Sequence, residues 1–338
     1  MFLRPSQSSD HDAVLELARL AGFGMTSLPP DPHVLRQKIE ASVKSFSRTY
    51  EKPGQESFFF VLEDPEKEAI VGTAGIKARI GLSQPFYSYK ITTITQLSSQ
   101  LDQLSKHSLL QVTNDLTGST EVGALFLRPD YRRDRLGKMM SLARFLFIAA
   151  YRTLFAEQII AEMRGVHDET GKTPFYSSLA RHFFDMSFAE ADYLNATQGN
   201  QFINDLMPKY PIYVSLLPKR AQRVIGQVNA ASEPARLLLE GQGFKYTGYI
   251  DIFDGGPTMI AARDAVDAVA ASIVAPISQI IELPEETPKY AVSNDRFETF
   301  RCTAGRLVRR DDGSVAITQR LAGRLDCAVG DTIRFYPL

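Results

Sequence analysis

The sequence is poor in cysteine, in net charge and in long apolar runs. Its 338 residues include two cysteines, Cys302 and Cys327, in no metal-binding spacing, so we expect buried thiols and no metal rather than a disulfide scaffold. A formal net charge of −1 gives no global field to attract nucleic acid or an acidic membrane. No run approaches the ~20 apolar residues of a membrane span. The first ten residues, MFLRPSQSSD, have no apolar signal core. We therefore expect a cytoplasmic protein without a nucleic-acid or membrane partner.

What the sequence does contain is enough apolar material for one large domain or two. Hydrophobic residues make up 44% of the chain, sufficient for a substantial core. The composition changes near Ala275-Pro276, after which short β-type runs alternate with turn residues. We predict a large domain over residues 1–275 and a small β-rich domain over residues 276–338.

The chain is organised around the stretch from Glu121 to Ala149. The run from Val122 to Leu127 is apolar except for Gly123, as in a central strand buried on both faces. Pro129 ends the strand. A basic segment follows, and then apolar residues recur at helical spacing. The segment comprises Arg132, Arg133, Arg135, Leu136, Gly137 and Lys138.

A strand, a basic turn with glycine and a helix form an arrangement that can hold a pyrophosphate. Free N–H groups and the positive dipole end of the helix favour the anion, and glycine allows a close backbone approach. The competing interpretation is a solvated, charged start of a helix. We favour phosphate binding because the strand before the segment and the amphipathic helix after it have the required order.

Two further segments lead to predictions. The run from Gln158 to Arg164 is expected to be a strand, with Glu162 and Arg164 on one face by period-two alternation. Between Ser83 and Asp115, the polar stretch from Gln96 to Ser108 has a helix-like pattern.

The basic segment also resembles a known motif. The order Leu127-x-Pro129-x-Tyr131-Arg132-x-x-Arg135-x-Gly137-Lys138 is similar to the acyl-CoA loop of the GNAT family of N-acetyltransferases, with Arg135 in place of the first glycine of that loop. Over its whole length the chain resembles, more specifically, the arginine N-succinyltransferases of bacterial arginine catabolism. The segments that carry this likeness are 26–29, 60–64, 116–119, 161–165, 206–213, 226–228 and 249–258.

The resemblance implies an α+β fold of the acyl-CoA N-acyltransferase (GNAT-like) type. Such a fold has a central mixed, mostly antiparallel sheet flanked by helices, and the thioester lies in a gap between two splayed strands. It further implies transfer of succinyl from succinyl-CoA to the α-amine of L-arginine, by direct attack in a ternary complex. Succinyl-CoA would be a co-substrate, with no permanently bound cofactor. A homo-oligomer or a heteromer of related subunits is expected.

Several site residues follow from this resemblance. Leu125, with Phe126 and Leu127, is expected to contact the succinyl-CoA, although an ordinary core strand explains the Leu125 side chain equally well. Arg164 would hold the succinate carboxylate, unless it forms a structural salt bridge with Glu162. The acceptor guanidinium would face Asp251 and Asp254, whose alternative role is turn formation near Gly255-Gly256. These expectations are implied by the resemblance.

The sequence departs from the family at one catalytic position. The family places a proton-donating histidine directly after its Gly-Gln-Val, whereas here Gly226-Gln227-Val228 is followed by Asn229. Asparagine cannot exchange a proton near neutral pH, although it can donate a hydrogen bond. Three interpretations are open. Asn229 would orient a water or an oxyanion while another group transfers the proton, or loss of the histidine has left a weak or altered transferase. Alternatively, the chain is a non-catalytic CoA-binding partner of a related subunit. Another amine acceptor is also left open.

Overall fold

The computed structural model describes residues 1–22, 25–48 and 54–338, and within these ranges fifteen strands join into one continuous sheet. The strands are β1 (Phe2–Pro5), β2 (Ser57–Asp64), β3 (Ala69–Lys77), β4 (Ser88–Ser98), β5 (Gln103–Thr113), β6 (Thr120–Leu127), β7 (Gln158–Glu162), β8 (Ile212–Tyr213), β9 (Lys245–Asp251), β10 (Pro257–Ala262), β11 (Ile273–Ile280), β12 (Lys289–Asn294), β13 (Cys302–Arg309), β14 (Val315–Ile317) and β15 (Thr332–Pro337). The helices are α1 (His11–Ala21), α2 (Pro32–Phe46), α3 (Leu136–Ala150), α4 (Pro174–Ser178), α5 (Arg181–Phe184), α6 (Phe188–Gln198), α7 (Gln201–Leu206), α8 (Lys219–Gln222), α9 (Glu233–Glu240), α10 (Asp267–Ala271) and α11 (Gln319–Leu325).

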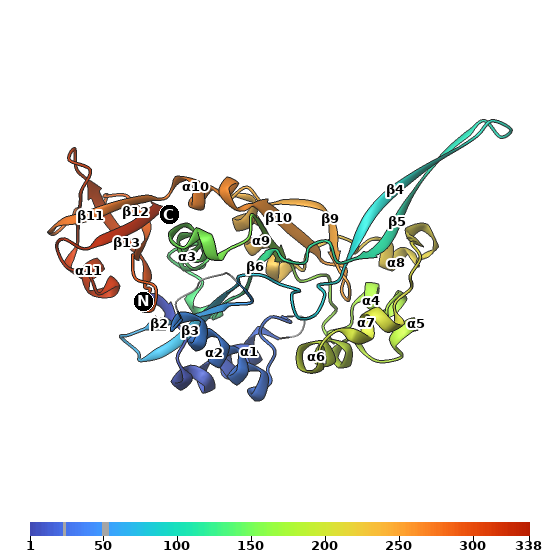
Figure 1. The fold of residues 1–338 in the computed structure, drawn as a ribbon, viewed down its shortest axis with the longest axis horizontal. Coiled ribbons are helices and arrows are strands. Elements are labelled where there is room, and N and C mark those ends of the chain that lie inside the picture. The colour runs from blue at the N-terminus through green and yellow to red at the C-terminus, as the bar shows by residue number, and fades with distance from the viewer. Residues whose placement is uncertain (23–24, 49–53) are drawn as a thin grey trace.

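The sheet is mixed and mostly antiparallel, as predicted. Its order is β12-β15-β11-β14-β13-β1-β2-β3-β6-β7-β10-β9-β4-β5-β8, and the parallel neighbours are β6 with β7 and β11 with β14. Helices flank both faces, with α1 and α2 on one side and α3 on the other (Figure 1). The GNAT-like α+β class is therefore confirmed.

Strand β2 shows why helices cover both faces of the sheet. Because alternate residues of a strand point to opposite faces, Phe58 and Phe60 pack into the core beneath α3. Phe59 and Val61 pack instead against α1 and α2. An almost uninterrupted apolar run is what a strand buried on both faces requires.

The last strands close into a small ring. Strand β12 pairs with β15, β15 with β11, β11 with β14, β14 with β13, and β13 again with β12. Helix α11 contributes Leu321, Ala322 and Leu325 to the interior of this ring. The ring joins the main sheet where Leu3 of β1 pairs with Cys302 of β13. The division at residues 275 and 276 stays a prediction, since β11 runs through it.

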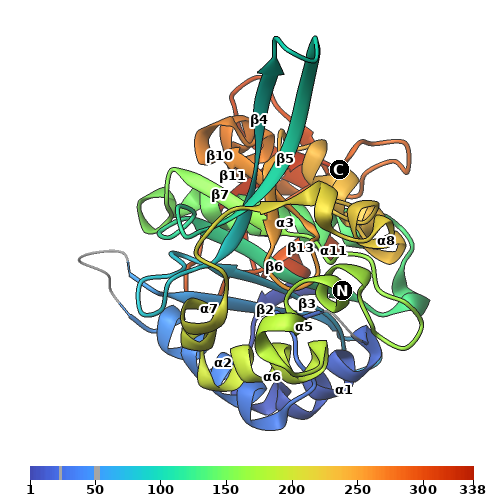
Figure 2. The same ribbon diagram turned by 90° about the vertical axis from the view of Figure 1, so that its right-hand side faces the viewer.

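The predicted helix-like stretch from Gln96 to Ser108 is wrong. These residues lie in β4 and β5, a long hairpin whose register runs unbroken from Ser88–Thr113 to Ser98–Gln103. The hairpin projects as an arm beyond the rest of the molecule (Figures 1 and 2). Toward the tip both faces are solvated, so the strands lack the period-two alternation of a half-buried strand, and the pattern was misleading.

Among the described residues, no helix combines the length and the apolar character needed to cross a lipid bilayer.

The aromatic core beneath α3 yields a first prediction. Phe147 is fully buried, and its ring lies 5.1 Å from Phe58, 5.3 Å from Phe60 and 5.1 Å from Phe300. Phe147→Ala would leave a cavity among rings from β2 and from the segment before β13. We therefore expect the unfolding free energy to fall by about 3–5 kcal/mol. Denaturant titration measures this loss. Phe183→Ala, at a position that is 38% exposed, is the control, and an equal loss in both variants would contradict the packing argument.

Candidate active site

Strands β6 and β7 diverge almost as soon as they meet. They pair at Thr120 with Ile159 and at Glu121 with Ile160, while β6 continues to Leu127. A register shift against β3 coincides with Ala124, whose φ of 49° is unusual for a residue with a side chain. Two side chains hold this bulge, since the Ala124 N–H donates to Ser27 Oγ at 3.1 Å and Thr73 Oγ1 donates to the Ala124 carbonyl at 2.8 Å. The result is a gap between two strands of the sheet.

A cavity of about 690 Å³ runs from this gap to the start of α3. It brings together nearly all the residues predicted from the sequence. Among its lining residues are 121–127 of β6, 132–138 before and in α3, Arg144, 161–164 at the end of β7, Asp251 and Asp254. Residues of α9 and of the turn before it close the remaining wall. Asn229 is the predicted site residue that is absent from this lining.

The start of α3 has the backbone geometry of an anion site. Asp134 and Arg135 both adopt positive φ, 53° and 58°, so Arg135 takes the left-handed conformation that glycine favours at this position of the motif. A side chain at Gly137 would meet nothing within 4 Å. In the first turn the N–H groups of Leu136 and Met139 donate to carbonyls, whereas those of Gly137 and Lys138 have no partner in the described part of the chain. These two donors lie beside the cavity.

Two arginines of the basic segment donate hydrogen bonds to backbone carbonyl oxygens. Arg132 Nε donates to the Leu127 carbonyl at 3.1 Å. Arg135 Nη1 donates to the backbone oxygen of Leu338 at 2.8 Å. Their guanidinium groups therefore organise the turn around the free N–H groups and add positive charge to it.

Two glutamates near the gap have opposite electrostatic environments. Burial acts to raise the pKa of Glu121, but Lys77, whose Nζ lies 2.8 Å from Glu121 Oε2, outweighs it and lowers that pKa. In the part of the chain that the structure describes, no cation forms an ion pair with Glu162. Burial, reinforced by the charges of Asp251 and Glu121, raises the pKa of Glu162 well above its usual range. A carboxylate of this kind holds a proton more tightly than an ordinary glutamate side chain.

The two aspartates differ in how their oxygens are used. Asp254 accepts the N–H of Gly165 at 2.7 Å on Oδ2 and that of Gly256 at 2.8 Å on Oδ1. A side chain at Gly165 would lie 2.6 Å from Asp254, so this approach requires glycine. Asp251 uses Oδ1 to accept the N–H groups of Phe253 and Asp254. The Asp251 side chain also interacts with the side chain of Asp254. Burial, with the neighbouring Asp254, raises the pKa of Asp251 to about 7.

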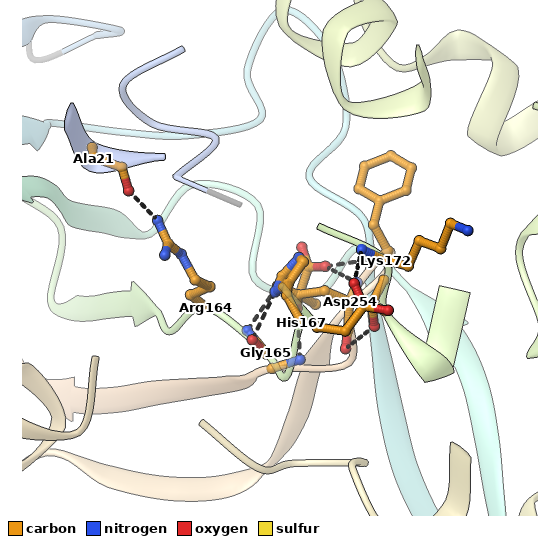
Figure 3. Close-up of polar contacts among 11 residues, drawn as sticks. Ala21, Arg164, Gly165, His167, Lys172 and Asp254 are labelled. Atoms are coloured by element: carbon orange, nitrogen blue, oxygen red, sulfur yellow. Dashed lines mark hydrogen bonds and ion pairs between the residues drawn. The ribbon is translucent and has the colours of Figure 1, made fainter. Parts of the chain in front are cut away.

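Arg164 and His167 point in different directions from the end of β7. Figure 3 shows Arg164 extending to the Ala21 carbonyl, which it contacts through Nη2 at 3.0 Å, and away from Asp254. In the described ranges no ion pair joins Arg164 to Glu162. His167 Nδ1 donates to the Gly165 carbonyl at 2.9 Å, and Nε2 lies 3.9 Å from Asp254 Oδ2. Burial lowers the pKa of His167.

Asn229 lies outside the cavity lining and forms hydrogen bonds that join two segments of the chain. Its N–H donates to the Arg164 carbonyl at 2.8 Å. Its side-chain Oδ1 accepts the Ala231 N–H at 3.0 Å and so caps the turn before α9. Asn229 thus links β7 to α9, and its carbonyl oxygen is already engaged.

The sequence interpretation missed Arg144. This residue is 3% exposed and lines the cavity from the interior of α3. The available signal was a single charged residue in the mostly apolar helical run from Met139 to Ala150. Helical periodicity assigns residues to faces, but it does not show that one buried position borders a cavity.

A mixed sheet whose parallel strands splay open beside the N-terminus of a helix is the architecture of the acyl-CoA N-acyltransferases. The profile described as "Arginine N-succinyltransferase beta subunit" matches residues 1–268, and that of its C-terminal domain matches residues 273–337. The chain therefore belongs to the arginine N-succinyltransferase family, which consists of acyltransferases.

Individual relatives agree with this assignment over the full length of the chain. The sequence is 41% identical over 344 residues to the arginine N-succinyltransferase of Yersinia pseudotuberculosis, covering 100% of this chain and 98% of that protein. It is 40% identical over 339 residues to that of Yersinia enterocolitica, with the same coverage. The solved structure of arginine/ornithine succinyltransferase subunit AI from Pseudomonas aeruginosa is similar with a TM-score of 0.90 and 34% identity, covering 99% of this chain and 98% of that one.

The unpaired Glu162 leads to a prediction about stability and pH. A carboxyl whose pKa is raised on folding stabilises the folded state below its unfolded pKa, and this contribution is lost as pH rises through the folded pKa. Glu162→Gln should therefore raise the unfolding free energy at pH 8 and change it little at pH 4. Thermal or denaturant unfolding at the two pH values measures the difference. The exposed Glu16→Gln is the control, and a pH-independent effect at Glu162 would contradict the electrostatic argument.

Proposed function

We propose that this protein transfers the succinyl group of succinyl-CoA to the α-amine of L-arginine, which gives N2-succinylarginine and free CoA. One observation carries the proposal: a single cavity joins free N–H groups at a helix start to a strand gap edged by unpaired carboxylates. The full-length similarity to arginine N-succinyltransferases supports the choice of donor and acceptor. Both substrates are small molecules, and no tightly held cofactor is needed.

The CoA diphosphate would bind at the start of α3. The N–H groups of Gly137 and Lys138 would donate to it, and the helix dipole would stabilise its charge. Arg132, Arg133 and Arg135 would add positive charge around the phosphates. From there the pantetheine arm would follow the backbone of Leu125, Phe126 and Leu127 toward the gap.

The thioester would lie where β6 and β7 separate. Attack by the amine turns its carbonyl oxygen into an oxyanion, which needs donors already in place. Backbone N–H groups of β6 that have no partner on β7 are suited to this role. Arg164 would hold the distal carboxylate of the succinyl group, since Nη2 binds Ala21 while the other guanidinium N–H groups are available.

The proton of the attacking ammonium would pass to Glu162. This carboxylate lines the gap, and its raised pKa makes it a stronger base than an ordinary carboxylate. The amine then attacks the thioester carbon, the carbon–sulfur bond breaks, and the thiolate of CoA takes a proton. Direct transfer is favoured because no cysteine or serine motif supports a covalent acyl-enzyme.

The acceptor guanidinium would face Asp251. Asp251 lines the cavity and accepts backbone N–H groups on Oδ1 alone, whereas both oxygens of Asp254 are occupied by backbone N–H groups. Asp254 would therefore hold the strand ends in place and add negative charge. Binding of a cation should favour the ionised form of Asp251, since the positive charge opposes the effect of burial.

A second candidate function rests on Asn229. Its side chain caps a turn and cannot supply the proton transfer that histidine would. On this alternative the chain is an acyl-CoA-binding subunit that needs a related partner for turnover. The name of the Pseudomonas aeruginosa structure, an arginine/ornithine succinyltransferase subunit, also keeps another amine acceptor and a heteromer as alternatives to a homo-oligomer.

A panel of donors and acceptors separates these functions. Thiol release is measured with succinyl-CoA or acetyl-CoA against arginine, ornithine, lysine and citrulline. We expect turnover with succinyl-CoA and arginine, and at least tenfold less with acetyl-CoA or with the neutral acceptor citrulline. Asn229→His run beside the wild type shows whether the substitution limits the rate. CoA binding without turnover by either protein would favour the non-catalytic subunit.

The helix start gives a direct test of the coenzyme site. Gly137→Leu has open space for its side chain, so the protein should fold normally while the side chain blocks the approach of the diphosphate. We expect CoA affinity by calorimetry to fall at least tenfold, with an unchanged melting temperature of the free protein. Gly323→Leu, at an equally open glycine of α11, is the matched control. Unchanged affinity at position 137 would contradict the diphosphate site.

A further inference from the structure

Arg144 is a buried cation without a counter-ion. It is 3% exposed and its hydrogen bonds go to its own helix, from Nε to the Ser141 carbonyl at 3.4 Å and from Nη2 to Ser141 Oγ at 3.0 Å. Within the described ranges no carboxylate forms an ion pair with it. Burial lowers the pKa of Arg144 to about 10.

Such an arrangement is unfavourable in the free protein. Removing a guanidinium from water is costly unless the lost hydrogen bonds are replaced. A guanidinium has five N–H donors, and the two contacts to Ser141 occupy a minority of them. Nη1 has no partner among the described residues, and the side chain lines the cavity. The unsatisfied donors therefore border the space that a ligand would fill.

The position of Arg144 indicates which part of the ligand it meets. Arg144 follows Gly137 by seven residues, two turns along the same face of α3 and about 10 Å along its axis. It is therefore well removed from the N–H groups that would hold the diphosphate. Leu237, Leu238 and Leu239 of α9 also line the cavity. A cavity lined by leucines and by a buried donor suits an uncharged chain with amide carbonyls better than a phosphate.

We infer that Arg144 binds an amide carbonyl of the pantetheine arm of CoA. This inference rests on the proposed CoA site and adds a residue that neither the motif nor the resemblance points to. The guanidinium donates to the carbonyl oxygen while the leucines of α9 pack on the apolar part of the arm. Ligand binding thus satisfies donors that are unsatisfied in the free protein.

The test is Arg144→Met, which keeps an unbranched apolar stem and removes the charge and the donors. Calorimetry measures binding of CoA and of adenosine 3′-phosphate 5′-diphosphate, which carries all the phosphates of CoA but no pantetheine. We expect the affinity for CoA to fall about ten- to a hundredfold, as for a charge-assisted hydrogen bond. Affinity for the pantetheine-free nucleotide should not change. The melting temperature of the free variant should equal or exceed that of the wild type, because an uncompensated buried charge is gone.

The other outcomes each overturn the inference. An equal loss for both ligands would assign Arg144 to a phosphate. An unchanged CoA affinity, whatever the melting temperature, would give Arg144 a purely structural role. Arg144→Gln, which retains a neutral donor, should recover part of the CoA affinity and serves if the methionine variant does not fold. Arg320→Met, at an exposed arginine, is the control. Wild-type protein that does not bind CoA would refute the proposed function itself, which is a separate result.

Discussion

The early separation of β6 from β7 is the constraint on which the site depends. Two paired positions hold the strands together, and the bulge at Ala124, fixed by Ser27 and Thr73, turns β6 away. A regular sheet would have closed this gap with a ladder of hydrogen bonds. Because the ladder is missing, backbone groups, the end of β7 and the helix after β6 face one cavity. The residues that line it come from widely separated parts of the chain, and the divergence of two strands brings them together.

Sequence reasoning succeeded where a pattern reflects burial and local backbone chemistry. The apolar run from Val122 to Leu127, the stop at Pro129 and the helix that follows the basic segment have local causes, and the structure contains all three. The helix begins at Leu136, within the basic segment. Sequence reasoning failed for the hairpin of β4 and β5, because hydrogen bonds between two strands stabilise it and neither strand alone has a characteristic pattern. It could not place Asn229 relative to the cavity, nor show that Arg144 borders it. These facts depend on how β7, α3 and α9 pack, and such long-range contacts leave no periodic trace in the sequence.

Charge is distributed unevenly along the cavity, which has a positive end and a negative end. The helix start and its arginines are positive, whereas the far end carries Glu162, Asp251 and Asp254. Glu121 is neutralised by Lys77, so the carboxylates beyond it are left without a cation. Burial and mutual repulsion raise the pKa values of Glu162 and Asp251. An anionic coenzyme and a cationic acceptor would therefore enter opposite ends of the same cavity. Among Glu162, Asp251 and Asp254, Glu162 at the end of β7 is the carboxylate suited to take a proton.

Asn229 is best understood from its backbone. Its N–H binds the Arg164 carbonyl, a contact that any residue except proline could make, and the Gly226 N–H binds the Gly255 carbonyl in the same loop. The loop therefore holds the ends of β7 and of the β9–β10 turn in register whatever the side chain at position 229. Loss of a histidine here would leave the shape of the cavity intact, because the side chain of Asn229 is engaged in a local cap. The substitution thus separates ligand binding from proton transfer. If turnover persists, proton transfer must come from groups that line the cavity, and Glu162 has the most suitable environment among them.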